Sequence, residues 1–319
     1  MEVVIQLILL AVGFVLLVKG ADWFVEGASG LAEKFGIPQL VIGLTIVAMG
    51  TSLPEAAVSV SAALKGSAEI TIGNIVGSNI MNVLLILGLT SVITPIAVQK
   101  STVKYEIPFV IAVSALLMGL GLTDNVVGMM DGILLWVLMI CYLLYLLRMA
   151  KKGADLPGEA EAFENEQNAK EKMTVFKMLV FILAGGAMIV IGSDVAVDAA
   201  TRLAHIFGMS ERLIGLTIVA FGTSLPELVT SVTAAIKGKA DIAVGNIVGS
   251  NIFNILFVVG TSALITPVAY VSAFTVDSIA CIASAALLWV LVLGKQRLGR
   301  IGGACMLVGY AAYFVYLLR

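Results

Sequence analysis

The feature that most constrains this chain is that a large part of it is written twice. Residues 41–55 read VIGLTIVAMGTSLPE and residues 213–227 read LIGLTIVAFGTSLPE, so the two segments differ at two of fifteen positions. GNIVGSNIMN at 73–82 recurs as GNIVGSNIFN at 245–254, with the same offset of 172 residues. The matches include polar residues in apolar surroundings, which low complexity does not produce. The sequence therefore predicts two copies of one structural unit.

The composition places both copies in a membrane. Hydrophobic residues make up 60% of the chain and charged residues only 13%. A soluble domain carries about 25% charged residues, so a soluble enzyme, a nucleic-acid-binding protein and a disordered chain are excluded. Apolar runs of membrane-spanning length recur along the whole sequence. We therefore expect an all-α integral membrane protein that lies in a lipid bilayer.

Each copy contains five candidate membrane spans. They lie near 3–24, 38–64, 71–94, 104–122 and 126–147 in the first copy, and near 174–200, 212–236, 242–266, 274–293 and 301–318 in the second. Because five is odd, the second copy enters the membrane from the opposite side. The expected architecture is ten transmembrane helices arranged as two inverted five-helix repeats, which is common among secondary transporters.

The predicted domains are a first five-helix repeat at 1–150, an acidic linker at 151–172 and a second, inverted five-helix repeat at 173–319. Lysine and arginine are concentrated in the loops on the linker's side of the membrane, and such loops stay in the cytosol. We therefore expect a multi-pass protein of the cell (plasma or inner) membrane. Both termini are expected outside and the linker in the cytoplasm.

The GTSLPE motif lies inside an apolar run, where its proline is expected to break the helix. Carbonyl groups just before the break lose their helical partners, and inside a membrane a cation can satisfy them. Glu55 and Glu227 follow each break within one turn and add carboxylates. Hydroxyl oxygens at the breaks come from Thr51, Ser52, Thr223 and Ser224.

The second motif supplies a serine and an asparagine four residues apart, hence on one face of a helix. They are Ser78 and Asn82 in one copy, and Ser250 and Asn254 in the other. The distance from Glu55 to Asn82 corresponds to one span, a turn and part of the next span. The two motifs of each copy can therefore meet near the membrane centre, and the inverted copy brings its own pair to the same point.

The resulting ligand set consists of oxygen atoms, which hard cations such as Ca²⁺ and Na⁺ prefer. Two carboxylates balance the charge of one calcium ion. An empty charged site in a membrane costs about 2.5 kcal/mol or more per charge, so the carrier should resist changing conformation while empty. This predicts obligatory exchange, with the ions as transported substrates and no bound cofactor.

These motifs resemble the two α-repeats of the calcium/cation antiporter superfamily, and in particular the sodium/calcium exchangers, which include prokaryotic calcium/sodium antiporters. The resemblance covers nearly the whole chain apart from the linker. It implies a core of four motif-bearing spans, across which two long tilted spans, the first and the sixth, slide to alternate access. It also implies the following cation ligands: Glu55, Glu227, Thr51, Ser52, Thr223, Ser224, Ser78, Asn82, Ser250 and Asn254, with backbone oxygens of Ala48 and Ala220.

One position separates subgroups of that family. Some archaeal members and the potassium-dependent exchangers carry aspartate where Asn254 stands here, which weakens the case for potassium transport. The linker is too short to contain the cytosolic calcium-sensing domains of the animal proteins. The only histidine, His205, lies outside both motifs, whereas some proton-coupled relatives carry histidine in the second motif.

The expected function is secondary active antiport of Ca²⁺ against Na⁺ by alternating access, without covalent chemistry and without an obligatory protein or nucleic-acid partner. A Ca²⁺/H⁺ antiporter and a K⁺-dependent Na⁺/Ca²⁺ exchanger stay open as alternatives, and a cation channel is a remote one. A membrane hydrolase using Ser52 or Ser224 ranks last, because neither motif offers a histidine or lysine base.

Structural roles compete with ligation at several positions. Asn82 and Asn254 could instead form hydrogen bonds between helices. The asparagines three residues earlier, Asn79 and Asn251, are expected to pack or bridge, and Asn74 and Asn246 are expected to be structural.

Overall fold

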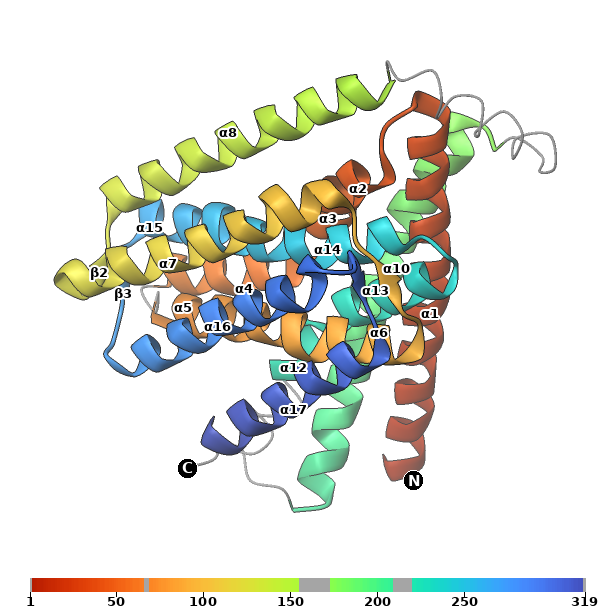
Figure 1. The fold of residues 1–319 in the computed structure, drawn as a ribbon. Coiled ribbons are helices and arrows are strands. Elements are labelled where there is room, and N and C mark those ends of the chain that lie inside the picture. The colour runs from red at the N-terminus through yellow and green to blue at the C-terminus, as the bar shows by residue number, and fades with distance from the viewer. Residues whose placement is uncertain (1, 66–68, 155–172, 209–219, 318–319) are drawn as a thin grey trace.

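The computed structural model describes residues 2–65, 69–154, 173–208 and 220–317, and it is built almost entirely of helices (Figure 1). The helices of the first repeat are α1 (Glu2–Phe35), α2 (Gln39–Ile42), η1 (Gly43–Val47), α3 (Ala48–Thr51), α4 (Leu53–Leu64), α5 (Glu69–Ile80), η2 (Met81–Leu87), α6 (Gly88–Ile93), η3 (Thr102–Glu106), α7 (Ile107–Asp124) and α8 (Met129–Ala154). Those of the second are α10 (Val175–Ile206), α12 (Ala220–Thr223), α13 (Leu225–Ile236), α14 (Ala240–Phe253), η5 (Asn254–Val259), α15 (Gly260–Ile265), α16 (Ala273–Leu293) and α17 (Arg300–Leu317). The η segments are π-helical turns.

Eight helical segments in the described ranges are long and apolar enough to cross a membrane, and a ninth candidate is the bent pair 39–51 and 53–64. The remaining predicted span, near 212–236, corresponds to α12 and α13, and its first residues lie outside the described ranges. The linker predicted at 151–172 also lies outside them from residue 155 onward. The prediction of an all-helical membrane fold is confirmed.

Three helices are longer than the spans predicted for them. α1 continues to Phe35, α8 to Ala154 and α10 to Ile206. Lys19 and Asp22, near the predicted end of the first span, do not end α1, because a helix can extend beyond the apolar layer as long as its backbone hydrogen bonds continue. Glycines with left-handed backbone follow α1 and α10, namely Gly36 with φ of 61° and Gly208 with φ of 77°. Glycine adopts this conformation without strain and commonly ends helices.

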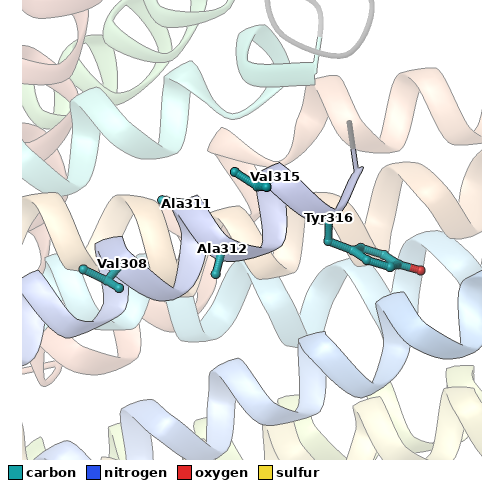
Figure 2. Close-up of a pocket in the computed structure, with 5 residues that line it drawn as sticks. All are labelled: Val308, Ala311, Ala312, Val315 and Tyr316. Carbon is teal, nitrogen blue, oxygen red and sulfur yellow. The ribbon is translucent and has the colours of Figure 1, made fainter. Parts of the chain in front are cut away.

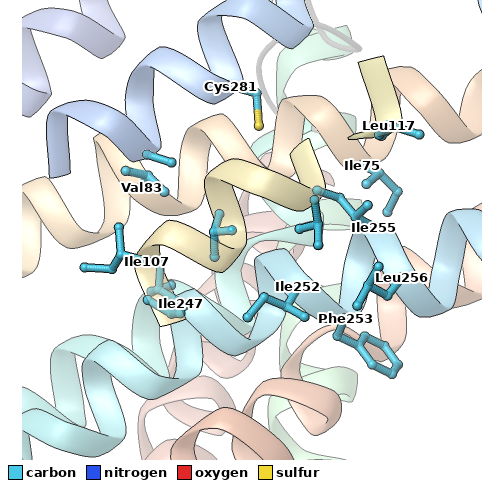
Figure 3. Packing of buried hydrophobic residues seen from close by; sticks show 14 of the residues in the cluster. Ile75, Val83, Ile107, Leu117, Ile247, Ile252, Phe253, Ile255, Leu256 and Cys281 are labelled. Carbon is cyan, nitrogen blue, oxygen red and sulfur yellow. The ribbon is translucent and has the colours of Figure 1, made fainter. Parts of the chain in front are cut away.

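The second-motif spans form the centre of the molecule. In the most apolar 18-residue stretch of residues 240–265, 94% of the residues are buried. In the corresponding stretches of α1 and α10, 22% of the residues are buried. Isoleucine, leucine and valine side chains from both repeats interdigitate around these central spans (Figure 3). The helices that carry the two motifs therefore lie in the most densely surrounded part of the protein.

The outer helices present apolar side chains outward. Val15 of α1, Leu183 of α10 and Ile301 of α17 are 61%, 73% and 84% exposed. A shallow pocket on the outer surface of α17 is also mostly apolar (Figure 2). Its lining residues are Val308, Ala311, Ala312, Val315 and Tyr316. Apolar surface on this scale is what a protein exposes to lipid rather than to water.

Two short strand pairs show that the repeats are inverted. β1 (Ile96–Ala97) pairs antiparallel with β4 (Arg297–Leu298), and β2 (Val126–Val127) pairs with β3 (Val268–Ala269), the second pair lying together at one end of the molecule in Figure 1. The β1 loop joins the third and fourth spans of its repeat, whereas the β4 loop joins the fourth and fifth of the other. Loops that pair lie on one side of the membrane, whereas the two loops on either side of a repeat's fourth span lie on opposite sides. The loops between the third and fourth spans of the two repeats therefore lie on opposite sides.

α1 and α10 run side by side, at a steep angle to the core helices (Figure 1). Their contact is made by glycines spaced seven residues apart, Gly13, Gly20 and Gly27 on α1 and Gly185 and Gly192 on α10. A Cβ atom added at Gly20 would lie 2.8 Å from the carbonyl oxygen of Gly185. Only glycine permits so close an approach of the two backbones.

Candidate cation site

Both predicted helix breaks are present, one residue before each Leu-Pro-Glu sequence. Ser52, with φ of −84° and ψ of 9°, separates α3 from α4, and the helical segments on either side meet at 50°. Ser224, with φ of −93° and ψ of 5°, separates α12 from α13 in the same way. The proline falls in the first turn after each break, where its missing N–H costs nothing. Each glutamate is thereby fixed in the first turn of a new helix.

Glu55 and Glu227 are both completely buried, and each carboxylate accepts a hydrogen bond from a serine of the opposite repeat. Oε1 of Glu227 accepts a hydrogen bond of 3.0 Å from the Ser52 hydroxyl. Oε1 of Glu55 accepts one of 3.1 Å from Ser78 and a longer one of 3.5 Å from Ser224. The crossed serines therefore bring the acids of both repeats into one cluster, as predicted.

Four oxygen atoms of the two duplicated motifs are buried without a hydrogen-bond partner in the part of the chain that the structure describes. They are Oε2 of Glu55, Oε2 of Glu227, Oδ1 of Asn82 and Oδ1 of Asn254. A buried acceptor left without a partner costs about 1–3 kcal/mol, and more when it is charged. Carboxylate and amide oxygens of this kind are ligands that a hard cation prefers.

The oxygens beside the first break are partly engaged. Thr51 donates to Oδ1 of Asn246 over 2.9 Å and lies 3.3 Å from the carbonyl oxygen of Ala48. The Ser250 hydroxyl donates to the same Ala48 carbonyl over 3.3 Å. In the second repeat, Ala220 begins α12 and Thr223 ends it, immediately before the Ser224 break.

Asn74 and Asn246, which the sequence suggests are structural, hold the acid-bearing helices in place. The amide of Asn74 donates to the main-chain carbonyl of Glu55 over 3.2 Å and to Ser59 over 2.9 Å. The amide of Asn246 contacts the main-chain carbonyl of Glu227 over 3.5 Å and donates to Ser231 over 2.9 Å. Because Thr51 bonds to Asn246, this second contact links the first repeat to the acid helix of the other.

Asn79 and Asn251 bridge the two central spans, as the sequence suggests. Each amide nitrogen donates to the main-chain carbonyl of the other residue over 3.1 Å. Asn82 and Asn254 also form hydrogen bonds between helices, through their amide nitrogens. Their carbonyl oxygens are the unpartnered atoms described above, so hydrogen bonding between helices and an oxygen directed at a cation are compatible in the same side chain.

The two motifs offer buried oxygen atoms of the kind that hard cations bind. The side-chain partners described for both carboxylates are hydroxyl groups, and these leave the negative charge uncompensated. A buried charge without a counter-charge is expensive, so a metal ion or protons must balance it.

Comparisons with known proteins agree with this chemistry. The profile of the family described as sodium/calcium exchanger protein matches residues 5–148 and 177–319, one match in each repeat. The inner membrane protein YrbG of Escherichia coli (strain K12) is 41% identical over 288 residues, which cover 88% of both chains. The sodium/calcium exchanger MaX1 of Methanosarcina acetivorans is 33% identical over 365 aligned positions, covering 99% of both chains.

A solved structure has the same fold. The sodium-calcium exchanger NCX_Mj, in crystals soaked with zero Na⁺ and Ca²⁺, superimposes with a TM-score of 0.84 at 31% identity and covers 99% of both chains. The profile matches most of this sequence, and relatives more than 30% identical span nearly all of it. The chain therefore belongs to the sodium/calcium exchanger family, and it is a membrane cation/calcium antiporter rather than an enzyme.

Proposed function

We propose that this protein exchanges cytosolic Ca²⁺ for external Na⁺ across the cell or inner membrane. The observation that carries the proposal is the set of four buried oxygens, on Glu55, Glu227, Asn82 and Asn254, that have no hydrogen-bond partner among the described residues. Two carboxylates match the charge of one calcium ion, and the same oxygens suit sodium ions. Because the two ions compete for one donor set, inward movement of sodium can drive calcium out.

We further propose that the predicted residues are the ligands of the transported ions. Glu55 and Glu227 would be the central ligands, because they are the charged groups of the cluster. The remaining ligands would be Thr51, Ser52, Ser78, Asn82, Thr223, Ser224, Ser250 and Asn254, with the carbonyl oxygens of Ala48 and Ala220. The burial of Glu55, Glu227 and the serine and asparagine side chains of this set supports it, as do the crossed hydrogen bonds between the repeats.

Alternating access would come from α1 and α10 moving together past the core. Their glycine contact supports movement as one body, because it brings the two backbones together from Gly13 to Gly27, over two heptads. Their own apolar surfaces face mostly outward, so sliding breaks fewer buried contacts than movement of a central span would. An empty site would hold two uncompensated carboxylates, which disfavours the passage of an unloaded carrier.

Reconstitution into lipid vesicles tests the choice of ions. Vesicles loaded with Na⁺ and diluted into sodium-free, potassium-free medium at clamped pH should take up ⁴⁵Ca²⁺, and uptake should stop when the sodium gradient is removed. Uptake that depends on added potassium would instead identify a K⁺-dependent exchanger. Calcium flux that needs no counter-ion would identify a channel.

A calcium/proton antiporter is the second candidate, and one observation favours it. Oε2 of Glu55 and Oε2 of Glu227 are carboxylate oxygens without a partner in the described structure, and a carboxylate oxygen accepts a proton as well as a metal ion. In the same vesicles, calcium uptake that follows an imposed pH gradient and is indifferent to sodium would establish this function and overturn the first proposal.

A further inference from the structure

Four asparagines at the centre of the protein form one closed hydrogen-bond network. Asn79 and Asn251 each donate their amide nitrogen to the main-chain carbonyl of the other over 3.1 Å. Asn254 donates to Oδ1 of Asn79 over 3.1 Å, and Asn82 donates to Oδ1 of Asn251 over 3.0 Å. All four side chains are at most 1% exposed. Each repeat thus contributes one asparagine that bridges and one whose oxygen has no partner within the described ranges.

The orientation of every amide in this network follows from the two main-chain carbonyls. A carbonyl oxygen can only accept, so Asn79 and Asn251 must each turn the amide nitrogen toward the partner's backbone. Their Oδ1 atoms are then fixed on the other side of the amide and can only accept. Asn254 and Asn82 must therefore present their own nitrogens to these acceptors. The remaining atom of each amide, Oδ1, is the one that is buried without a partner in the described structure.

We propose that Asn79 and Asn251 are positioning residues, which fix the amides of Asn254 and Asn82 so that each offers oxygen and not nitrogen to the transported cation. This inference rests on the proposed function, in that a cation binds at these oxygens. An asparagine amide has two ends of nearly equal size, and a flipped amide would direct N–H donors at a positive ion. A carboxylate has no such ambiguity, so an orienting partner matters only when the ligand is asparagine.

The orienting contacts cross between the repeats. Asn79 of the first repeat orients Asn254 of the second, and Asn251 orients Asn82. Neither asparagine ligand is therefore set by its own repeat. The arrangement repeats the crossing seen at the acids, where serines of each repeat bond to the glutamate of the other.

A purely structural role for Asn79 and Asn251, as a clamp between helices, predicts different behaviour in double variants. Asn79→Ala removes the acceptor that faces the Asn254 amide. If orientation is the role of Asn79, then Asn254→Asp should repair the defect, because both ends of a carboxylate are oxygen. If Asn79 only clamps the helices, a second change at 254 cannot restore what the alanine removed.

Calcium binding to the purified full-length protein in detergent, measured by equilibrium binding of ⁴⁵Ca²⁺, is the readout. We expect Asn79→Ala to weaken binding by about tenfold or more, the effect of losing one properly directed ligand. Asn79→Ala with Asn254→Asp should return within about threefold of the unaltered protein, a difference of less than about 1 kcal/mol. The matched control is Asn79→Ala with Asn82→Asp, which adds the same charge at the asparagine that Asn79 does not orient, and it should show no comparable repair.

The mirror series, Asn251→Ala with Asn82→Asp or with Asn254→Asp, must give the reciprocal pattern, and it serves as the test if the Asn79 variants do not fold. Unchanged affinity in the folded alanine variants would overturn the inference, as would repair by aspartate at either position alike. Binding of Sr²⁺ and Na⁺ to the same proteins is also measured, so that the orientation role can be tested with another cation. If the unaltered chain binds no calcium, the proposed function fails, whereas the orientation role is still judged from the cation that does bind.

Discussion

The hydroxyl of Ser52 in the first repeat donates to Oε1 of Glu227 in the second over 3.0 Å, and the two residues are 175 positions apart in the chain. Ser224 faces Glu55 in the reverse sense over 3.5 Å and also lies 3.1 Å from the hydroxyl of Ser78. Each acid thus has a serine partner in the opposite repeat. The site exists only where both repeats meet, and movement of one repeat relative to the other must alter it.

Neutralising either acid should abolish calcium transport. Glu55→Gln and Glu227→Gln each remove one of two charges that balance a calcium ion, so we expect calcium exchange to fall by about 100-fold or more, equivalent to about 2.7 kcal/mol of binding. Uptake of ⁴⁵Ca²⁺ into sodium-loaded vesicles is the measurement. Glu26→Gln, at an exposed position on α1, should retain near-normal uptake. Near-normal exchange by a glutamine variant at 55 or 227 would remove these acids from the mechanism.

The crossed serine should matter for affinity more than for folding. Ser52→Ala leaves Oε1 of Glu227 without the hydroxyl that the described structure gives it, and we expect calcium affinity to change by about five- to tenfold, or about 1–1.4 kcal/mol. Equilibrium ⁴⁵Ca²⁺ binding measures this. Ser284→Ala is a matched control, because Ser284 is equally buried but donates to the Cys281 carbonyl in α16. Equal effects of the two variants would show that the loss is not specific to the site.

Much of this architecture could be predicted because duplication makes polar residues conspicuous. GTSLPE in an apolar run has few physical explanations, and the breaks at Ser52 and Ser224 lie where the prolines predict them. The acids were predicted to meet, and the crossed hydrogen bonds agree. Sequence spacing could not show which serine serves which acid, because a repeat motif looks the same whether it binds its own glutamate or its partner's.

Other features depended on contacts that periodicity does not contain. The structural reading of Asn74 and Asn246 was correct, but their hold on the glutamate carbonyls comes from a neighbouring span. The π-helical turns that begin at Met81 and Asn254 leave no mark in the apolar pattern. The first span was predicted to end near residue 24, whereas α1 continues to Phe35 and is followed by Gly36, because charged residues mark the limit of the apolar layer and do not end the helix.

The glycine contact between α1 and α10 should not tolerate a methyl group. Gly20→Ala would place a Cβ atom 2.8 Å from the Gly185 carbonyl oxygen, so the two helices must separate. We expect a loss of about 1–3 kcal/mol in stability, seen as a lower melting temperature in detergent, together with slower transport. Gly119→Ala is the control, since a Cβ atom at Gly119 in α7 meets nothing within 4 Å. A Gly20→Ala protein as stable and active as the control would contradict close packing as the basis of joint movement.

The strand pairs make a topological prediction that does not depend on the ions. Ala97 on β1 is paired with Arg297 on β4, so cysteines placed at these two positions should react with a membrane-impermeant thiol reagent from the same side. A cysteine at Asn125, in the loop before β2, should react from the opposite side, because β2 and β3 belong to the other set of loops. The experiment uses a protein whose native Cys141, Cys281 and Cys305 have been replaced.

In intact cells, positions 97 and 297 should be protected and position 125 labelled, since lysine- and arginine-rich loops face the cytosol. Labelling of 97 and 297 from opposite sides would contradict the inverted repeat, whereas labelling of both from outside would keep the repeat and reverse the proposed orientation.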